Sequence, residues 1–439
     1  MKTYQRSVHL MPWREQNLMD KKIKRTFLQF KKSLLKLFLI IPPRYREGLI
    51  VIYLFLKYHR NIQKNRSKTK EVLNTWKKKK PHLYQNSKKA VWTHCLRQPK
   101  SDDYALFLDA YDRQQVHCIR RHISNHLPDN EPILICPVKN DLQRVKMSYT
   151  HHKSIGIKHF VYLDNNSDDG TFEWLFKQQV DLYQVKAAFN THAKCAWIRQ
   201  LTDIYGYNRW YLILDSDELF AYPGMENYPV QNLIQFTQQE KMSQIQSLLI
   251  DMYAKGNIIK TTPQTKDSHL HAIRKEYCYF DTDSYLIEPS YKNRKIIGGP
   301  RSRIFNHGRQ FYDALLTKSP LCYLKAKDFF YIHYLQPYYK NFNYPLISAL
   351  LHYKFLPDDI QKYKQIARQG HYAHQSADYK KYLSILKQNP NLSFFYSKSQ
   401  IYSHSFDLLK INVINQKNCH QFLSGLKHKD TRGPVDNKT

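Results

Sequence analysis

Short apolar blocks alternate with longer amphipathic stretches between residues 132 and 220. The apolar blocks have the length of β-strands and occupy residues 133–137, 159–163, 182–185 and 210–214. The stretches between them have helical spacing and occupy residues 141–154, 172–177 and 193–205. We expect Asp141 to cap the first of these helices and Gly156 to follow its end. The alternation predicts an α/β fold with a parallel sheet, right-handed crossovers and helices on both faces.

Beyond residue 220 the alternation is less regular. Residues 245–252 and 329–334 have the composition of strands, and residues 301–305 predict another strand after a flexible Gly-Gly-Pro segment. From residue 342 onward the pattern predicts helices, most clearly at residues 345–355 and 379–386.

These changes divide the chain into parts of different character. We predict a basic helical arm, a connector, a mainly parallel α/β domain, a helical extension and a disordered polar tail, at residues 1–80, 81–130, 131–356, 357–426 and 427–439 respectively.

Positive charge is concentrated at the start of the chain. The formal net charge is +33, and residues 1–80 hold 22 Lys and Arg against 4 Asp and Glu, which is a net +18. Such asymmetry indicates an anionic partner, either acidic lipid or nucleic acid. The apolar stretches 34–41 and 49–56 are too short to cross a bilayer, which takes about 20 apolar residues. They either lie in the membrane interface or pack on the main domain.

The cysteines and the N-terminus bear on the cellular compartment. Seven scattered cysteines without a CxxC pair indicate reduced and mostly buried thiols. The first twenty residues have no apolar core of a secretory leader. We expect a cytoplasmic protein, peripheral on the inner face of the cytoplasmic membrane.

Carboxylates follow the fourth apolar block directly. Residues 210–214 are apolar, and Asp215, Ser216, Asp217 and Glu218 come next. Two Asp separated by one residue on an extended backbone point the same way, so both can reach one hard cation. A divalent ion held there would suit a diphosphate group.

Two further polar loops end neighbouring strands. Residues 136–140 follow the first block, and residues 164–171 follow the second. The carboxyl ends of parallel strands meet on one rim of a sheet, where ligands bind in open α/β folds. We therefore expect the three loops to line a single crevice.

These motifs resemble those of a GT-A-fold glycosyltransferase of the family 2 type. In the bacterial branch of that family the pattern is CPVKN, LDNxSxDGT and LDxDE, which here stands at residues 136–140, 163–171 and 214–218. Residues 298–305, 318–321 and 350–355 are also similar to that branch and to family 92. The resemblance covers residues 132–356, about half of the chain.

The resemblance implies transfer of a sugar from a nucleotide-sugar donor to a glycan or lipid-linked acceptor in bacterial surface polysaccharide synthesis. It implies Mn²⁺ or Mg²⁺ as cofactor, with Asp215 and Asp217 as the metal-binding pair. Donor contacts would come from the first two loops, from Asp215 and from later cations, namely Pro137, Val138, Lys139, Asn140, Asp164, Asn165, Asp215, Arg301, Arg303 and Lys318.

The third metal ligand and the catalytic base are less defined by the motifs. His333 and His352 both qualify as the late histidine ligand, and we favour His333 because it lies near the end of an expected strand. An inverting transferase needs a carboxylate base. The candidates are Asp281, Asp283 and Glu218, although Asp281-Thr282-Asp283 departs from the family's usual Glu-Asp pair.

Two other classes of function compete with this interpretation. A metal-dependent nuclease or other nucleic-acid enzyme would use the positive charge and the 34 Tyr. Against it, the chain has no recognisable nucleic-acid-binding motif, and the charge lies mostly outside the acidic core. A non-enzymatic lipid-surface scaffold is disfavoured by three intact acidic loops, so we expect no nucleic-acid partner.

Overall fold

The computed structural model describes residues 107, 110, 111, 113–124, 127–259, 270–288, 295–306, 315–326, 328–336, 346–356, 359–370 and 373–430. The predicted basic arm and most of the connector lie outside these residues, as does the tail from residue 431.

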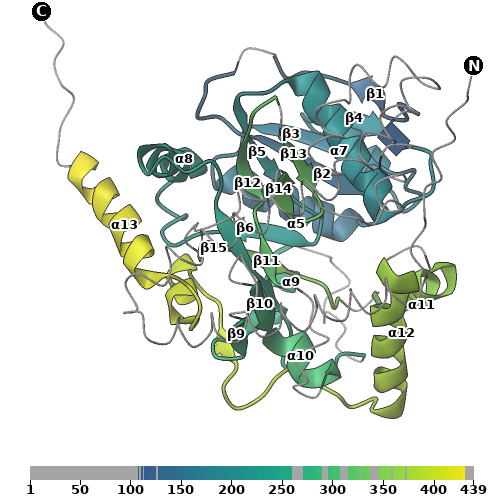
Figure 1. The fold of residues 1–439 in the computed structure, drawn as a ribbon. Helices are drawn as coiled ribbons and strands as arrows, with labels where there is room; N and C mark the ends of the chain where they lie inside the picture. Colours follow the sequence, from purple (N-terminus) through teal and green to yellow (C-terminus); the bar gives the residue numbers. More distant parts are fainter. Residues whose placement is uncertain are drawn as a thin grey trace, which may run out of the picture. The chain divides into compact units, whose positions relative to one another are not determined.

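A six-stranded sheet forms the first layer of the fold (Figure 1). Its strands lie in the order β1 (His117–Arg120), β4 (Asp181–Gln184), β3 (His159–Asp164), β2 (Ile133–Val138), β5 (Arg209–Ile213) and β12 (Leu321–Leu324). The four inner strands are parallel, as the alternating pattern predicts, whereas β1 and β12 pair antiparallel at the edges. The fold is therefore mixed α/β.

Both faces of the four parallel strands are buried, which explains why these strands are nearly continuous apolar runs. In β2, Leu134 and Cys136 point into one core while Ile133 and Ile135 point into the other. Helix α7 (Thr191–Tyr205) packs in the second core, with Trp197 fully buried. Helices α5 (Leu142–Ser154), α6 (Thr171–Phe176) and α8 (Val230–Gln239) contribute to the first core.

A second sheet shares the first core. Its strands lie in the order β11 (Thr317–Lys318), β7 (Gln246–Asp251), β15 (Leu346–His352) and β6 (Glu218–Ala221). Strand β15 is parallel to β7 and antiparallel to β6. The chain passes between the two sheets from β5 to β6 and again from β11 to β12, and the crossings touch where Ile213 N donates to Pro320 O at 2.9 Å.

Two predicted elements are wrong. Residues 345–355 are expected to be helical, but their core is β15, a central strand buried along its whole length. A fully buried strand and a buried helix segment are both uninterrupted apolar runs, so periodicity does not separate them. Residues 301–305 belong to helix α10 (Gly299–Phe305), not to a strand, because Pro300 occupies its first turn, where proline favours a helix.

The predicted strand at residues 329–334 is instead a hairpin of β13 (Phe329–Tyr331) and β14 (Tyr334–Gln336). Smaller elements follow β7: α9 (Leu270–Glu276), β8 (Tyr279–Phe280), β9 (Tyr285–Glu288) and β10 (Lys295–Gly298).

The C-terminal part is largely helical, as predicted. It contains α11 (Asp359–Gln369), α12 (Ala373–Gln388), β16 (Gln400–Ile401), the 3₁₀ helix η3 (Ser405–Lys410) and α13 (Gln416–Asp430). Tyr363 and Tyr382 from α11 and α12 join Phe305, Phe355 and Phe394 in a third, aromatic core. This core places α11 and α12 next to the segment that follows β15.

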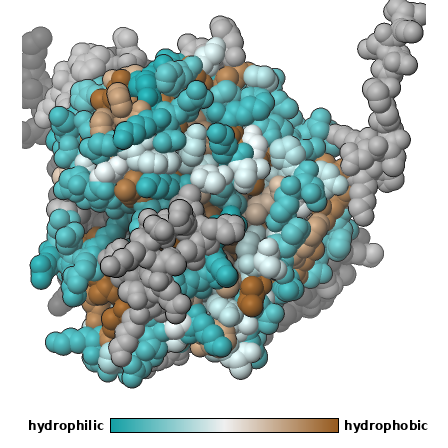
Figure 2. Space-filling view, turned by 180° about the vertical axis from the view of Figure 1, so that it is seen from behind, coloured by the Kyte–Doolittle hydropathy of each residue, from teal (hydrophilic) through white to brown (hydrophobic). Residues whose placement is uncertain are grey.

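One face of the molecule is mainly polar (Figure 2), and most of the described cysteines are buried free thiols. The face shown in Figure 2 is mainly hydrophilic with small apolar areas. Within the described residues, none of the helices combines the length and apolar character needed to cross a membrane. The six described cysteines are free thiols, and four of them are buried.

Candidate functional site

The carboxyl end of β2 is a topological switch point. From β2 the chain continues to β3 and then β4 on one side, and it returns to β5 on the other side. The loops after β2 and β5 therefore lie where ligands usually bind in open α/β sheets. Hydrogen bonds join the three polar loops on this rim, because Asn140 N donates to Ser167 Oγ, and Ser216 Oγ donates to Asp141, which follows the first loop. A single crevice lined by them stays a prediction.

The first two loops are tied to each other. Asn140 Nδ2 donates to Asp168 Oδ1 at 2.7 Å, and Asp168 N donates back to Asn140 Oδ1 at 2.9 Å. Asn140 N also donates to Ser167 Oγ at 2.9 Å. Asn140 has φ 48°, a conformation that asparagine tolerates better than most residues. Pro137 and Val138 end β2 beside them, and Lys139 is exposed.

Two buried oxygens stand at the end of β3 without a donor. Asp164 Oδ2 accepts from Ser167 N at 3.0 Å, but Asp164 Oδ1 has no hydrogen-bond partner among the described residues. Asn165 donates through Nδ2 to Val185 O and Ala187 O, and its Oδ1 is likewise without a partner in that part of the chain. A buried acceptor without a donor costs about 1–3 kcal/mol. Adjacent orphaned acceptors suit a ligand that brings N–H or O–H groups.

Asp215 lies between two lysines. Its Oδ1 is 2.8 Å from Lys194 Nζ and its Oδ2 is 3.4 Å from Lys318 Nζ. Lys194 comes from the first turn of α7, and Lys318 ends β11. Burial would raise the pKa of Asp215, but the two lysines hold it below its ordinary value. About a third of the Asp215 side chain is exposed (36%), so this carboxylate can still reach a ligand.

Lys318 also neutralises Glu218. The Lys318 ammonium is 2.7 Å from Glu218 Oε2, and both side chains are almost fully buried. The pair exists because the two crossings between the sheets lie side by side. Burial raises the pKa of Glu218, and the neighbouring Asp215 and Asp217 add to that rise while Lys318 opposes it.

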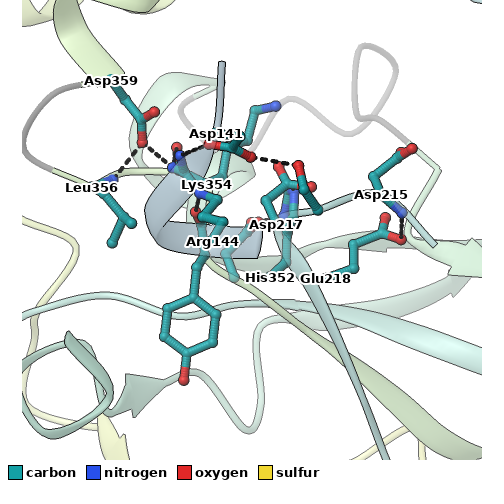
Figure 3. Close-up of polar contacts among 12 residues, drawn as sticks. Asp141, Arg144, Asp215, Asp217, Glu218, His352, Lys354, Leu356 and Asp359 are labelled. Atoms are coloured by element: carbon teal, nitrogen blue, oxygen red, sulfur yellow. Dashed lines mark hydrogen bonds and ion pairs between the residues drawn. The ribbon is translucent and has the colours of Figure 1, made fainter. Parts of the chain in front are cut away.

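Asp217, which precedes β6, faces His352 at the end of the adjacent strand β15 (Figure 3). Asp217 Oδ2 is 3.1 Å from His352 Nε2, and His352 Nδ1 is 2.7 Å from Asp251 Oδ1. Arg301 Nε in turn donates to Asp251 Oδ2 at 2.7 Å. Strand register produces this arrangement, because His352 on β15 is paired with Asp251 on β7 and with Glu218 on β6.

The hydrogen-bonded residues Asp217, His352 and Asp251 shift one another's pKa values. Burial would lower the pKa of His352, but Asp217 and Asp251 raise it above its ordinary value. Burial would raise the pKa of Asp251, but Arg301 and His352 lower it to about 2. Burial also opposes ionisation of Asp217, and His352 nevertheless holds the Asp217 pKa well below its ordinary value.

Asp217 and His352, which form an ion pair here, could also hold a divalent metal ion. Adjacent ligand atoms of an octahedral Mg²⁺ site lie about 3 Å apart, because each is about 2.1 Å from the ion. The 3.1 Å separation matches this, and a carboxylate on the second imidazole nitrogen is the usual support of a metal-binding histidine. No group of three or more His, Cys, Asp or Glu among the described residues could hold a metal ion. A metal at this pair would therefore need oxygens from a ligand and water, as is common for Mg²⁺.

Sequence patterns alone missed two residues beside this pair, Asp141 and Arg144. Asp141 precedes α5 but does not cap it as expected, because its carboxylate accepts from Arg144 Nη1 at 2.9 Å and from Ser216 Oγ. Arg144 also donates to Tyr353 O at 2.6 Å and pairs with Asp359. An Asp and an Arg three residues apart at the start of a rim helix is the pattern that would have indicated them.

Other predicted site residues do not join these contacts, although His333 lies close enough for the charges of Lys318, Asp215 and His352 to act on its pKa. His333 is in the turn between β13 and β14, where its carbonyl accepts from Ser319 N at 2.9 Å, and burial together with Lys318 lowers its pKa to about 3. Asp281 is fully buried and binds Arg303 and Tyr253, while Asp283 binds Lys398 and Tyr396. Neither aspartate contacts Asp215, Asp217 or His352 in the described part of the chain. Their role as proton acceptors stays a prediction.

Comparisons with known proteins add little. No protein-family model matches the chain, and no curated protein matches it. Among solved structures, CMP:2-keto-3-deoxy-manno-octonic acid synthetase complexed with CTP matches with 8% sequence identity and a TM-score of 0.21. That match covers 68% of this chain and 99% of the synthetase chain. A TM-score this low supports no transfer of the synthetase's ligand or activity to this chain.

Proposed function

We propose that this protein is a metal-dependent glycosyltransferase that moves a sugar from a nucleotide-sugar donor to a glycan or lipid-linked acceptor. The observation that carries the proposal is the Asp217–His352 pair at a topological switch point, 3.1 Å apart and supported by Asp251. The resemblance of the rim motifs to family 2 glycosyltransferases agrees with this placement.

Asp217 Oδ2 and His352 Nε2 would hold Mn²⁺ or Mg²⁺. When bound, the ion supplies Lewis-acid stabilisation of a departing nucleoside diphosphate. We select His352 in place of His333, because His352 contacts Asp217 and has its second nitrogen fixed by Asp251.

Lys194 and Lys318 would bind donor phosphates. Both ammonium groups already lie on one partly exposed carboxylate, Asp215, at the rim. A diphosphate brings more negative charge than the carboxylate and can draw both lysines toward it. Asp215 is then free to accept hydrogen bonds from hydroxyl groups of the ligand.

Asp164 and Asn165 would recognise the nucleoside. Their buried orphaned oxygens accept hydrogen bonds only, so they fit the N–H groups of a base or the hydroxyls of a ribose. Asn140, tied to Asp168, would keep the loop after β2 in place above them. The crevice would thus hold the nucleoside beside β3 and the diphosphate beside β5.

The test is a screen of the purified protein with Mn²⁺ against a panel of nucleotide sugars, with single-stranded nucleic acid digested in parallel. We expect slow hydrolysis of one donor type. Asp217→Asn and His352→Gln should each lower this turnover at least about 100-fold, because each removes a metal ligand. Glu240→Gln is the control, because Glu240 is exposed at the end of α8 and its carboxylate accepts from Gln421 Nε2 at 3.0 Å, outside the proposed site.

The competing functions give different results. Nuclease activity without turnover of any nucleotide sugar would overturn the proposal in favour of a nucleic-acid enzyme. Donor turnover that persists in EDTA and in Asp217→Asn would overturn the metal-dependent form of it.

A further inference from the structure

The two segments that carry the proposed metal ligands are both bound by one buried ion pair, Asp141–Arg144. The first is the loop between β5 and β6, which carries Asp217. The second is the segment after β15, which follows His352. Asp141 and Arg144 lie between them, with side chains only 7% exposed each (Figure 3).

Each residue of the pair holds one segment. Asp141 Oδ2 accepts from the hydroxyl of Ser216, the residue immediately before Asp217. Arg144 Nε donates to the carbonyl of Tyr353, the residue immediately after His352, at 2.6 Å. Arg144 Nη1 closes the connection with Asp141 Oδ1 at 2.9 Å. The chain Ser216–Asp141–Arg144–Tyr353 thus runs parallel to the direct Asp217–His352 contact.

Helix α11 makes further contacts with Asp141 and Arg144. Arg144 Nη2 pairs with Asp359 at the first position of α11, and Lys362 Nζ lies 3.2 Å from Asp141 Oδ1. Asp359 also accepts from Leu356 N at 2.6 Å, which fastens the same segment after β15. Burial would lower the pKa of Arg144, but Asp359 and Asp141 raise it, so the guanidinium stays charged.

We propose that Arg144 and Asp141 are positioning residues that set the separation of Asp217 and His352 and thereby the affinity of the metal site. This inference rests on the proposed function, because it assigns a role to residues behind the same metal pair. Neither residue contacts Asp217 or His352 through its side chain. They act through the backbone on either side of the two ligands, and the charge of Arg144 also helps to lower the pKa of Asp217.

The test measures Mn²⁺ affinity directly, by calorimetry and by the electron paramagnetic resonance of bound Mn²⁺, with and without a nucleoside diphosphate. Arg144→Lys keeps the charge but loses the bidentate geometry, and we expect its Mn²⁺ dissociation constant to rise 10–100-fold. Ser216→Ala removes only the hydroxyl link, and we expect a rise of about 3–10-fold.

Arg120→Lys is the matched control. Arg120 also donates to main-chain carbonyls, including Val180 O at 3.3 Å, but these lie before β4 at the opposite rim of the sheet. We expect this variant to bind Mn²⁺ like the wild type, whatever it costs in thermal stability. Thermal unfolding of each variant shows whether the measured protein is folded. If Arg144→Lys does not fold, Ser216→Ala still tests the positioning role.

The outcomes separate the two proposals. Wild-type protein that binds no Mn²⁺ in either condition overturns the metal site of the proposed function, and this inference with it. Wild-type binding with unchanged affinity and spectra in folded Arg144→Lys and Ser216→Ala overturns the positioning role alone. Weaker binding in both, with Arg120→Lys unchanged, supports it.

Discussion

His352 Nδ1 lies 2.7 Å from Asp251 Oδ1, and strand register is the cause. Strands β7 and β15 are parallel and end together, so their last residues are direct neighbours on the second sheet. The contact fixes the imidazole ring with its other nitrogen toward Asp217. The pairing of the two strand backbones thus sets the orientation of the His352 side chain.

Replacing Asp251 tests this relationship. Asp251→Asn keeps the shape of the side chain but removes the charge that faces His352 and Arg301. We expect Mn²⁺ affinity to fall 10–100-fold, because the partner of a metal-binding histidine sets its orientation and basicity. Calorimetric titration of Mn²⁺ into the folded variant measures the change. Unaltered affinity would show that the β15 backbone alone orients the ring.

Metal affinity should depend on pH through His352. Its pKa is raised above about 6.5, so the imidazolium stabilises the metal-free fold below that pH, and this contribution is lost as pH rises through the folded pKa. Mn²⁺ needs the unprotonated nitrogen and competes with the proton. Apparent Mn²⁺ affinity should therefore increase as pH rises through the folded pKa, which lies above the ordinary value, and level off beyond it. The variant His352→Gln should bind weakly without this dependence, and a flat wild-type profile would contradict the assignment.

Acid should destabilise the fold through His151 and His152. His151 Nε2 donates to Phe220 O at 2.8 Å, and His152 Nε2 accepts from Phe220 N at 3.1 Å, so both rings hold the free edge of β6 in neutral form. Burial and Arg274 lower the pKa of His151 to about 4, and burial together with His151 lowers the pKa of His152 well below its ordinary value.

A histidine with a lowered folded pKa stabilises the fold above about pH 6.5, and this stability is lost as pH falls toward the folded value. One pKa unit corresponds to about 1.4 kcal/mol, so His151 alone should cost about 3 kcal/mol between pH 7 and pH 4. Chemical unfolding across this range measures the loss. His151→Gln should flatten the profile, and an unchanged acid slope would refute the explanation.

The buried Lys318–Glu218 pair should show strong coupling. Lys318→Met leaves Glu218 without its cation in a nearly dry position, and we expect the free energy of unfolding to fall by about 3–5 kcal/mol at pH 7. Adding Glu218→Gln removes the unpaired charge and should restore at least half of this loss. A double-mutant cycle by urea unfolding gives the coupling energy. Additive losses would show that the two charges do not depend on each other.

Gly298 should tolerate no side chain. It has φ +100°, and a Cβ there would lie 2.2 Å from Ser284 O, a main-chain atom just before the paired strand β9. We expect Gly298→Ala to cost more than about 2 kcal/mol and to displace α10 with Arg301. Gly370→Ala is the control, because Gly370 also has a positive φ but nothing lies within 4 Å of its Cβ position. The control should cost only about 1–2 kcal/mol in thermal unfolding. Equal losses of stability in Gly298→Ala and Gly370→Ala would mean that the clash with Ser284 O is relieved by a local shift.

The four parallel strands of the first sheet and its polar rim could be predicted from the sequence alone, whereas the edge strands β1 and β12 could not. Local spacing reports strand or helix period, and a parallel sheet buried on both faces leaves continuous apolar runs such as β2 and β5. The acidic loop after β5 follows from where the apolar run ends. Short-range pattern was sufficient for the positions of Asp164, Asp215 and Asp217 on one rim.

Only the tertiary structure decided what these residues contact. Asp217 and His352 are 135 positions apart, and Arg144 and Tyr353 are 209 positions apart. The pairing of β15 with β6 and β7 brings them together, and its register depends on packing across the whole second sheet. Local periodicity carries no information on that register, and it also made β15 resemble a buried helix. The choice of His352 over His333 and the Asp141–Arg144 connection therefore came from the fold.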